Sequence, residues 1–282
     1  RLEQLCEQGA IPIHRWHGDV AANQKSDLIE HPGGVLQITP ESIESLLINK
    51  TKSLQRLFSG LEFIVIDEVH AFLEADRGIQ LQSQLERLSM YGKERPRRIG
   101  LSATIGDCEI AKRWLNPKDP ANVHLINPVV DVPPTRLSHL HYIASKGDIP
   151  DEMLDDLYFL TRNRKSLIFC NSRRYVEQIT AQLNRRCHHD RFDERYLPHH
   201  GSISKEIRED AEEKMREEDR PHSVVCTNTL ELGIDIGQLE LAVQIDSTHS
   251  VMSFVQRLGR TGRKHGAQRI MQIYSSELAS EQ

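Results

Sequence analysis

The 282-residue chain has few of the features that mark secreted, membrane or disulfide-bonded proteins. Its five cysteines are odd in number, widely spaced and without a CxxC pair, so neither a disulfide framework nor a zinc site of that pattern is expected. No apolar run approaches the length that crosses a bilayer, and no apolar stretch follows a basic amino terminus. We therefore expect free thiols, a reducing cytoplasm and no membrane partner.

The chain also has no excess of basic charge and few aromatic residues. Its formal net charge is −5, and aromatic residues make up 5% of it. A nucleic-acid site must then be a local groove on a protein of net negative charge. Base stacking on aromatic side chains is expected to contribute little to nucleic-acid binding. The CHHD segment (Cys187–Asp190) has adjacent residues that rarely ligate one tetrahedral ion, so a polar helix end is expected there.

Short apolar runs alternate with amphipathic stretches of helical period along the chain. This alternation predicts an α/β fold with mainly parallel sheets and helices on both faces. Strands are expected at Ile11–Trp16, Val35–Thr39, Leu61–Ile66, Arg98–Ser102, Ser138–Ile143, Ser166–Cys170, Arg195–Pro198, Ser223–Thr227, Leu241–Ile245 and Gln268–Tyr274. The main helices are expected at Pro40–Ile48, Gly78–Tyr91, Asp107–Leu115, Asp151–Thr161, Arg173–Arg186, Ser204–Glu218 and Val251–Arg260.

A proline-containing segment, NPVVDVPPT (Asn127–Thr135), is the best candidate for a domain boundary. Its prolines cannot continue a helix or a central strand. We expect a first domain over residues 1–130, a linker over 131–136 and a second domain over 137–282.

An acidic pair, Asp67 and Glu68, ends the apolar run of FIVIDEVH (Phe63–His70). Open parallel sheets bind ligands at the carboxyl ends of their strands, and phosphoryl transfer needs a divalent cation and a group that positions the attacking water. We predict that Asp67 holds Mg²⁺, through its waters, and that Glu68 orients or deprotonates the water. The alternative is a surface acid pair at a strand end.

The LSAT segment (Leu101–Thr104) follows the next strand. Ser102 and Thr104 have short hydroxyls within reach of a hydrogen bond to the acids. The alternative is an N-cap for the helix that begins near Asp107, and taken alone this alternative is favoured.

Two arginines, Arg260 and Arg263, lie within QRLGRTGR (Gln256–Arg263). Guanidinium groups that converge on a phosphate stabilise charge in the transition state of phosphoryl transfer, and glycines at 259 and 262 permit close approach to a ligand. A basic helix end favoured by the helix dipole explains the charges but not the glycine spacing.

A strand also runs into a glycine-containing loop in VVCTNTLELGIDIG (Val224–Gly237). Thr227 is a candidate donor to a nucleic-acid phosphate, and Asp235 a candidate acceptor from a ribose hydroxyl. The alternative for Asp235 is a turn in which its side chain accepts a backbone N–H.

These motifs occur in the order and spacing of the superfamily 2 DExH/DEAD helicases. The segments that resemble motifs II to VI are DEVH, SAT, LIFCNSR (Leu167–Arg173), the Thr227 loop and QRLGRTGR. WHGD (Trp16–Asp19) and TPES (Thr39–Ser42) resemble nucleic-acid-contacting segments of the first lobe. With HHGS (His199–Ser202) and ELGIDIG, the pattern resembles the large helicase-related, or Lhr-type, group.

The resemblance implies two RecA-like lobes that bind ATP with Mg²⁺ between them and close on it through a hinge at Pro133–Pro134. It implies that Asp67 and Glu68 belong to the first lobe, while Arg260 and Arg263 sense the γ-phosphate from the second. The remaining residues implied at the nucleotide are Asp235 near the ribose, Gln256 as a link to His70, and His70, Ser102 and Thr104 as coupling residues.

The resemblance also implies a single nucleic-acid strand, DNA or RNA, that crosses both lobes. The candidate backbone contacts are Thr39, Arg173 and Thr227, with His17 and His200 as weaker candidates. Such contacts give little base specificity and make binding salt-sensitive. Two other functions stay open: a non-catalytic nucleic-acid-binding or assembly module, and a double-strand translocase subunit of a defence or restriction complex.

The resemblance fails at one point, because GxxxxGK[ST], whose amides and lysine hold nucleotide phosphates, does not occur. We expect these residues to belong to a longer protein with further domains or subunits, so that the first lobe is truncated here. The alternative is a degenerate relative without activity. By itself the chain is expected to bind ATP weakly and turn it over poorly.

Overall fold

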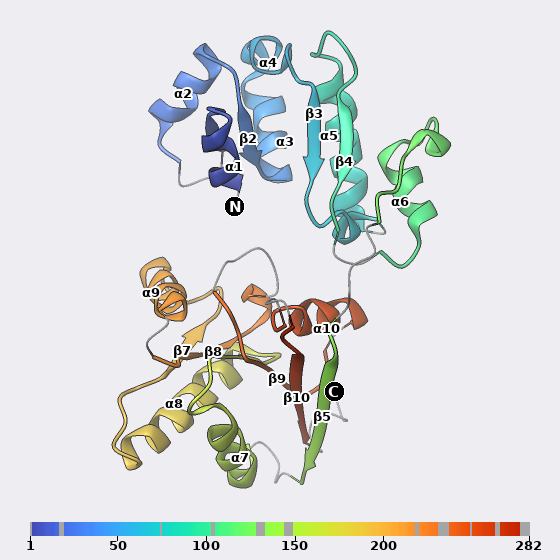
Figure 1. Ribbon diagram of the computed structural model, residues 1–282. Coiled ribbons are helices and arrows are strands. Elements are labelled where there is room, and N and C mark those ends of the chain that lie inside the picture. Colours follow the sequence, from blue (N-terminus) through green and yellow to red (C-terminus); the bar gives the residue numbers. More distant parts are fainter. Residues whose placement is uncertain are drawn as a thin grey trace. The chain divides into compact units, whose positions relative to one another are not determined.

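The computed structural model describes residues 2–16, 20–73, 75–102, 105–127, 133–143, 149–217, 220–230, 237–248, 250–262 and 266–276. The chain divides into two compact units, Arg1–Pro128 and Val129–Gln282. Every described strand pair is parallel, and helices lie beside the strands in both units (Figure 1). The predicted α/β class with parallel sheets is confirmed. The expected linker at 131–136 stays a prediction, because residues 128–132 lie outside the described ranges.

The first unit contains two parallel strand pairs, β1–β2 and β3–β4. Its elements are α1 (Leu2–Gln8), β1 (Ile13–Trp16), α2 (Ala22–Glu30), β2 (Val35–Ile38), α3 (Pro40–Asn49), α4 (Thr51–Phe58), β3 (Phe63–Ile66), the 3-10 helix η1 (Val69–Phe72), α5 (Asp76–Ser89), β4 (Arg97–Gly100), α6 (Cys108–Leu115) and η2 (Pro120–Asn122). One cluster of buried side chains joins α3, α4 and α5 to the strands. The helices α1, α2 and α4 were not among those expected, because segments of 7 to 9 residues offer few apolar positions for a helical period.

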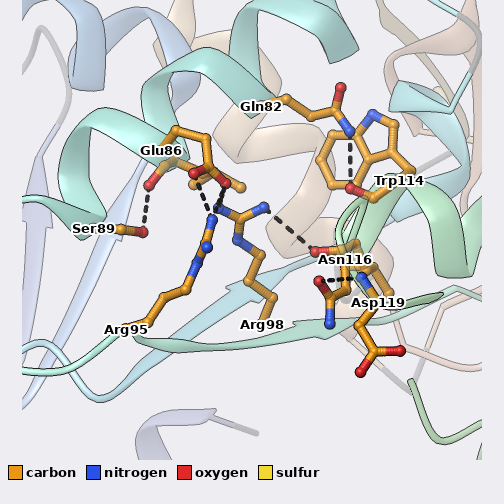
Figure 2. A network of polar contacts seen from close by, with 10 residues as sticks. Gln82, Glu86, Ser89, Arg95, Arg98, Trp114, Asn116 and Asp119 are labelled. Carbon is orange, nitrogen blue, oxygen red and sulfur yellow. Dashed lines mark hydrogen bonds and ion pairs between the residues drawn. The ribbon is translucent and has the colours of Figure 1, made fainter. Parts of the chain in front are cut away.

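A polar network fixes β4 against the helices of the first unit (Figure 2). Glu86 of α5 accepts hydrogen bonds from Arg95 and from Arg98 of β4, the latter at 2.6 Å. Burial alone would raise the pKa of Glu86, but the two guanidinium groups lower it below its usual value. Gln82 donates to the carbonyl of Trp114 at 2.8 Å, so α5 also holds α6. The carboxyl end of β4, where Ser102 follows, is thereby held in place.

The second unit contains one six-stranded parallel sheet in the order β5-β10-β9-β6-β8-β7. Its elements are β5 (Thr135–Tyr142), α7 (Asp151–Thr161), β6 (Ser166–Phe169), α8 (Arg173–His189), β7 (Tyr196–His199), α9 (Lys205–Arg216), β8 (Ser223–Cys226), the 3-10 helix η3 (Asn228–Leu230), β9 (Leu241–Ile245), α10 (Val251–Leu258) and β10 (Arg269–Ser276). None of the described helices is long and apolar enough to span a membrane.

The central strands β6, β8 and β9 are buried at every position because helices cover both faces of the sheet. Successive side chains alternate between two clusters: Ile168 packs with residues of α7 and α8, whereas Leu167 and Phe169 pack with residues of α9. A third, smaller cluster joins α10 to β9 and β10. Since all the strands are parallel, their carboxyl ends lie along one edge of the sheet, where ligands of such sheets bind.

Candidate functional site

The acidic pair of the first unit lies directly after β3, in a sharp turn. Glu68 has a left-handed backbone, with φ 50° and ψ 46°, and the carboxylate of Asp67 accepts its N–H at 3.0 Å. Val69 then donates to the carbonyl of Leu101 at 2.9 Å. A left-handed conformation at a residue other than glycine costs on the order of 1 kcal/mol or more and is concentrated at functional sites. The turn places both carboxylates at the carboxyl end of β3.

His70 connects the acidic pair to the end of β4. Its Nδ1 lies 2.6 Å from the hydroxyl of Ser102 and 3.4 Å from Oε2 of Glu68. The second contact lacks hydrogen-bond geometry, and Glu68 Oε2 is a buried atom without a hydrogen-bond partner in the described part of the chain. Burial of a polar atom without a partner is unfavourable, so native proteins retain it mainly where it has a role.

The predicted coupling residues therefore meet in part. Ser102 reaches His70 instead of bonding the acids directly, and Thr104 lies outside the described residues. The alternative role of Ser102 as a helix cap is wrong, because Asp107 caps α6 by accepting the N–H of Glu109 at 2.8 Å. The carboxylate of Asp107 accepts a backbone N–H at this helix end, so Ser102 is not needed as a cap and its hydroxyl contacts His70 instead.

The donor set at the end of β3 suits a hydrated magnesium ion. Mg²⁺ is commonly held by one or two carboxylates together with waters and substrate phosphates. Asp67 is exposed and Glu68 is partly buried, so one strand end offers two carboxylates. In the second unit, by contrast, the CHHD side chains diverge: Cys187 is fully buried, whereas His188 and His189 are exposed on α8.

In the second unit, the residues of QRLGRTGR begin on α10 and continue into the turn before β10. Arg260 is buried and follows α10 directly, and Gln256 is partly buried on the helix. Gly262 has a φ of 68°, and a Cβ there would lie 2.8 Å from Cγ and 3.0 Å from N of Arg269. Gly262 is thus required for packing against β10. The sequence analysis had predicted this glycine for close approach to a ligand, and packing within the chain is a second reason for it. Arg263 and Asp235 lie outside the described residues.

Arg257 is a site-forming residue that the sequence analysis missed. Its side chain is 2% exposed, its Nη1 donates to Oε1 of Gln244 on β9, and its guanidinium lies 4.9 Å from the centre of the Phe169 ring on β6. It therefore fixes α10, and with it Arg260, to two central strands. The helical period contained a signal, because Arg257 lies next to Leu258 and three residues after Phe254, which both pack inward.

The nucleic-acid candidates of the second unit gather at the carboxyl ends of neighbouring strands. Arg173, the first residue of α8, is exposed and donates to the hydroxyl of Ser202 in the HHGS loop. Thr227 follows β8 and donates its N–H to the carbonyl of His199 at 3.3 Å. The sheet order places β6, β8 and β7 side by side, so these residues share one edge.

The two histidines of HHGS are buried and order this loop. The His200 side chain is 3% exposed, and its Nδ1 accepts the N–H of Ser202 at 3.3 Å, so a contact of His200 with a strand stays a prediction. His199 lies between Thr229, at 2.8 Å, and Glu212, at 3.2 Å. Burial lowers the pKa of His199, and the opposing effect of Glu212 is smaller.

The remaining candidates lie in the first unit. Thr39 is exposed at the N-terminus of α3, where its hydroxyl accepts the N–H of Ser42 at 3.3 Å. A helix N-terminus favours a negatively charged group, so this position remains suited to a phosphate contact. His17 lies outside the described residues.

A buried acid that the sequence analysis did not single out lies at the carboxyl end of β9. Asp246 is 8% exposed, has a left-handed φ of 62° and donates its N–H to the carbonyl of Tyr274 at 2.6 Å. Burial raises its pKa, and the N–H of Ser276 opposes this shift. No sequence pattern marks this aspartate, because its burial depends on β10 lying beside β9.

Two family models match the chain in succession. Residues 1–112 match the DEAD/DEAH box helicase family, and residues 150–265 match the helicase conserved C-terminal domain. The first match covers the acidic pair, and the second covers α8, the HHGS loop and Arg260.

Curated relatives match most of this chain. The Lhr helicase/probable uracil glycosylase of Mycolicibacterium smegmatis is 31% identical over 88% of this chain and 18% of its own length. The ATP-dependent helicase Lhr-Core of Methanothermobacter thermautotrophicus is 32% identical over 88% of this chain and 29% of its own length. The chain thus spans less than a third of either relative.

A solved structure agrees with these relatives. The Mycobacterium smegmatis helicase Lhr, bound to single-stranded DNA and AMP-PNP, matches with a TM-score of 0.81 and 28% identity, over 96% of this chain and 36% of that one. The family matches, the relatives and this structure together show that the chain belongs to the superfamily 2 helicases with RecA-like lobes, in the Lhr-type group.

Proposed function

We propose that the intact protein is an ATP-dependent helicase or translocase that moves along a nucleic-acid strand. The observation that carries this proposal is the buried Oε2 of Glu68, which has no hydrogen-bond partner in the described structure and lies beside the His70–Ser102 pair. Relatives named as ATP-dependent helicases support it. The activity is proposed for the intact protein, because GxxxxGK[ST] does not occur in these 282 residues.

The proposed role of the first unit is to hold the cation and the attacking water. Asp67 holds Mg²⁺ through bound waters, and the ion, when bound, neutralises charge on the phosphates. Glu68 accepts a hydrogen bond or a proton from the water. His70, in contact with Ser102 at 2.6 Å, positions the Glu68 carboxylate, which is supported by the 3.4 Å distance from its Nδ1 to Oε2 of Glu68.

The proposed role of the second unit is to stabilise charge on the transferred phosphoryl group. Arg260 and Arg263 supply the guanidinium groups, with Arg257 as the positioning residue that fixes α10, the helix that precedes Arg260. Asp235 is proposed to contact the ribose and Gln256 to respond to His70, as the resemblance implies.

The proposed partner of the intact protein is a single nucleic-acid strand. Arg173, Thr227 and Thr39 are the proposed backbone contacts, which is supported by the exposure of Arg173 and Thr39 and by the shared sheet edge of Arg173 and Thr227. The Lhr structure bound to single-stranded DNA supports this partner class. We also propose a cytoplasmic location, which rests on the free cysteines Cys6, Cys108, Cys170 and Cys187, because free thiols persist in a reducing compartment.

Substitution of Glu68 by Gln tests the enzymatic proposal. Gln keeps the size of the side chain but is a poor proton acceptor, so nucleic-acid-stimulated ATP hydrolysis by the intact protein should fall about 100-fold or more. The matched control is Glu62→Gln, an exposed acid just before β3, which should keep wild-type activity. Unchanged hydrolysis in the Glu68 variant would show that this carboxylate is not part of an ATPase site.

Tailed duplexes of DNA–DNA, DNA–RNA and RNA–RNA distinguish the substrate classes. Strand displacement that requires a single-stranded tail supports a helicase. ATP-driven movement on blunt duplex without displacement would favour a double-strand translocase instead, and nucleic-acid binding without hydrolysis would favour a non-catalytic module.

A further inference from the structure

Two histidines of β5 converge on one hydroxyl group at the edge of the second unit. His139 Nε2 lies 2.8 Å from Ser275 Oγ, and His141 Nδ1 lies 3.0 Å from the same oxygen. Both imidazoles are exposed. None of the motifs of the nucleotide or nucleic-acid site includes these three residues, which lie on β5 and β10, adjacent strands in Figure 1.

The strand geometry explains why these side chains meet. Residues two apart on a strand point to the same face, so His139 and His141 project together. Ser275 of β10 lies directly opposite His141 in the parallel register, and Ile273 lies opposite His139. Within the described sheet β5 pairs only with β10, and His139 and His141 are both exposed to solvent.

We propose that His139 and His141 form a surface site for a divalent transition-metal ion of the Ni²⁺, Cu²⁺ or Zn²⁺ class. Neutral imidazole is a preferred ligand of these ions, with metal–nitrogen distances of about 2.0–2.1 Å. Because both nitrogens contact one oxygen, they are at most about 6 Å apart. One ion of tetrahedral geometry bound by both nitrogens needs them about 3.4 Å apart. Because both side chains are exposed, they reach this distance by rotation at a small cost in free energy.

Ser275 has a separate role in this site. A hydroxyl has one hydrogen, so it donates to only one imidazole and accepts from the other when no ion is bound. With an ion present, the hydroxyl is placed to hydrogen-bond a water that completes the coordination. The site selects against Mg²⁺, which prefers oxygen ligands, and is therefore independent of the proposed nucleotide chemistry.

Titration of the intact protein with Ni²⁺ and Cu²⁺ tests the proposal. Isothermal titration calorimetry should show one equivalent that is lost, or weakened about tenfold or more, in His139→Ala and in His141→Ala. The control is His188→Ala/His189→Ala, which removes two exposed imidazoles that are adjacent on a helix and should leave that equivalent unchanged. Paramagnetic resonance of substoichiometric Cu²⁺ should show two nitrogen ligands in the wild type and fewer in either single variant.

A gain-of-binding variant keeps the test independent of any loss of folding. Ser275→His places a third imidazole opposite His141, and three histidines are a common metal-binding set, so affinity should rise at least about tenfold. Identical binding by the wild type and both single alanine variants, or no gain from Ser275→His, would overturn the proposal and leave a hydrogen-bonded cluster only.

Discussion

Two four-residue strands of similar apolar sequence, β3 and β6, have different surroundings in the two units. β6 is buried at every position, whereas Phe63 and Val65 of β3 are 52% and 57% exposed. β6 lies between β9 and β8 under helices on both faces, while β3 pairs only with β4 among the described strands. The comparison teaches that neighbours, more than the apolar run itself, set the burial of a strand. In the described part of the chain, Arg260 thus follows a helix that packs on buried strands, whereas the acids of the first unit follow a strand with one described neighbour.

The sharpest test of this comparison exchanges one phenylalanine in each strand for alanine. Phe169→Ala removes a fully buried ring and should lower the free energy of unfolding of the second unit by about 3–5 kcal/mol. Phe63→Ala removes a half-exposed ring and should cost the first unit about 1 kcal/mol or less. Hydrogen–deuterium exchange measured by mass spectrometry follows each unit in the 282-residue chain. Equal losses in the two units would break the comparison.

The second prediction concerns Arg257, which attaches α10 to this core. Arg257→Met leaves Oε1 of Gln244 without that donor and should cost about 1–3 kcal/mol. The kcat of ATP hydrolysis should fall by a larger factor than KM rises, because a shift of α10 displaces Arg260, which follows it. The double variant Gln244→Met/Arg257→Met should recover part of the stability but not the activity. If the two substitutions are strictly additive, this hydrogen bond does not fix the helix.

The third prediction concerns the contact between Ser102 and His70, which lies beside the acidic pair. Ser102→Ala removes the hydroxyl that His70 contacts and should destabilise the first unit by about 0.5–1.5 kcal/mol. It should also reduce the strand displacement achieved per ATP hydrolysed. The control is Ser89→Ala, whose hydroxyl donates to the carbonyl of Leu85 within α5, and whose effect on the free energy of unfolding should be within about 0.5 kcal/mol. Displacement per ATP that matches the control would remove Ser102 from the coupling path.

The smallest effect is expected from the buried acid of the second unit. Burial raises the folded-state pKa of Asp246 above its ordinary value of 3.8, so the folded state loses stability relative to the unfolded state as pH rises through that shifted range. Asp246→Asn removes this penalty, keeps an acceptor for Ser276 and tolerates the left-handed backbone.

The variant should therefore be more stable than the wild type near neutral pH, with the difference shrinking as the solution is acidified. Urea unfolding below pH 3.8, the ordinary pKa of an aspartate, and at neutral pH measures this difference. A constant difference, or one that grows on acidification, would contradict the assigned direction of the pKa shift.

Much of the fold was predictable because its signals are local. The bounds of α7 and β9 are those expected, and the other predicted strands and helices differ from the observed ones by a few residues at their ends. The acids at the end of β3 followed from an apolar run that stops at Asp67. Three short helices were not predicted, since brief segments offer little periodicity.

Motif order proposes the charged residues of the candidate site, because Asp67, Glu68 and Arg260 are unusual side chains at the ends of apolar or amphipathic stretches. Their roles stay predictions, and the contacts that hold them in place were not predicted. Sequence spacing did not identify the burial of His200 or the attachment of Arg257, because both depend on contacts between strands and helices distant in the chain.

The sequence by itself determined the alternation of parallel strands and helices, the position of acids and arginines at their ends, and the family. The tertiary structure alone decided that Glu68 keeps a buried oxygen beside His70, that Arg257 lies over Phe169, and that His139 and His141 meet at Ser275. The physical reason is the range of the interactions. Periodicity and capping act within a few residues, whereas burial and hydrogen bonding depend on which strands become neighbours in the sheet.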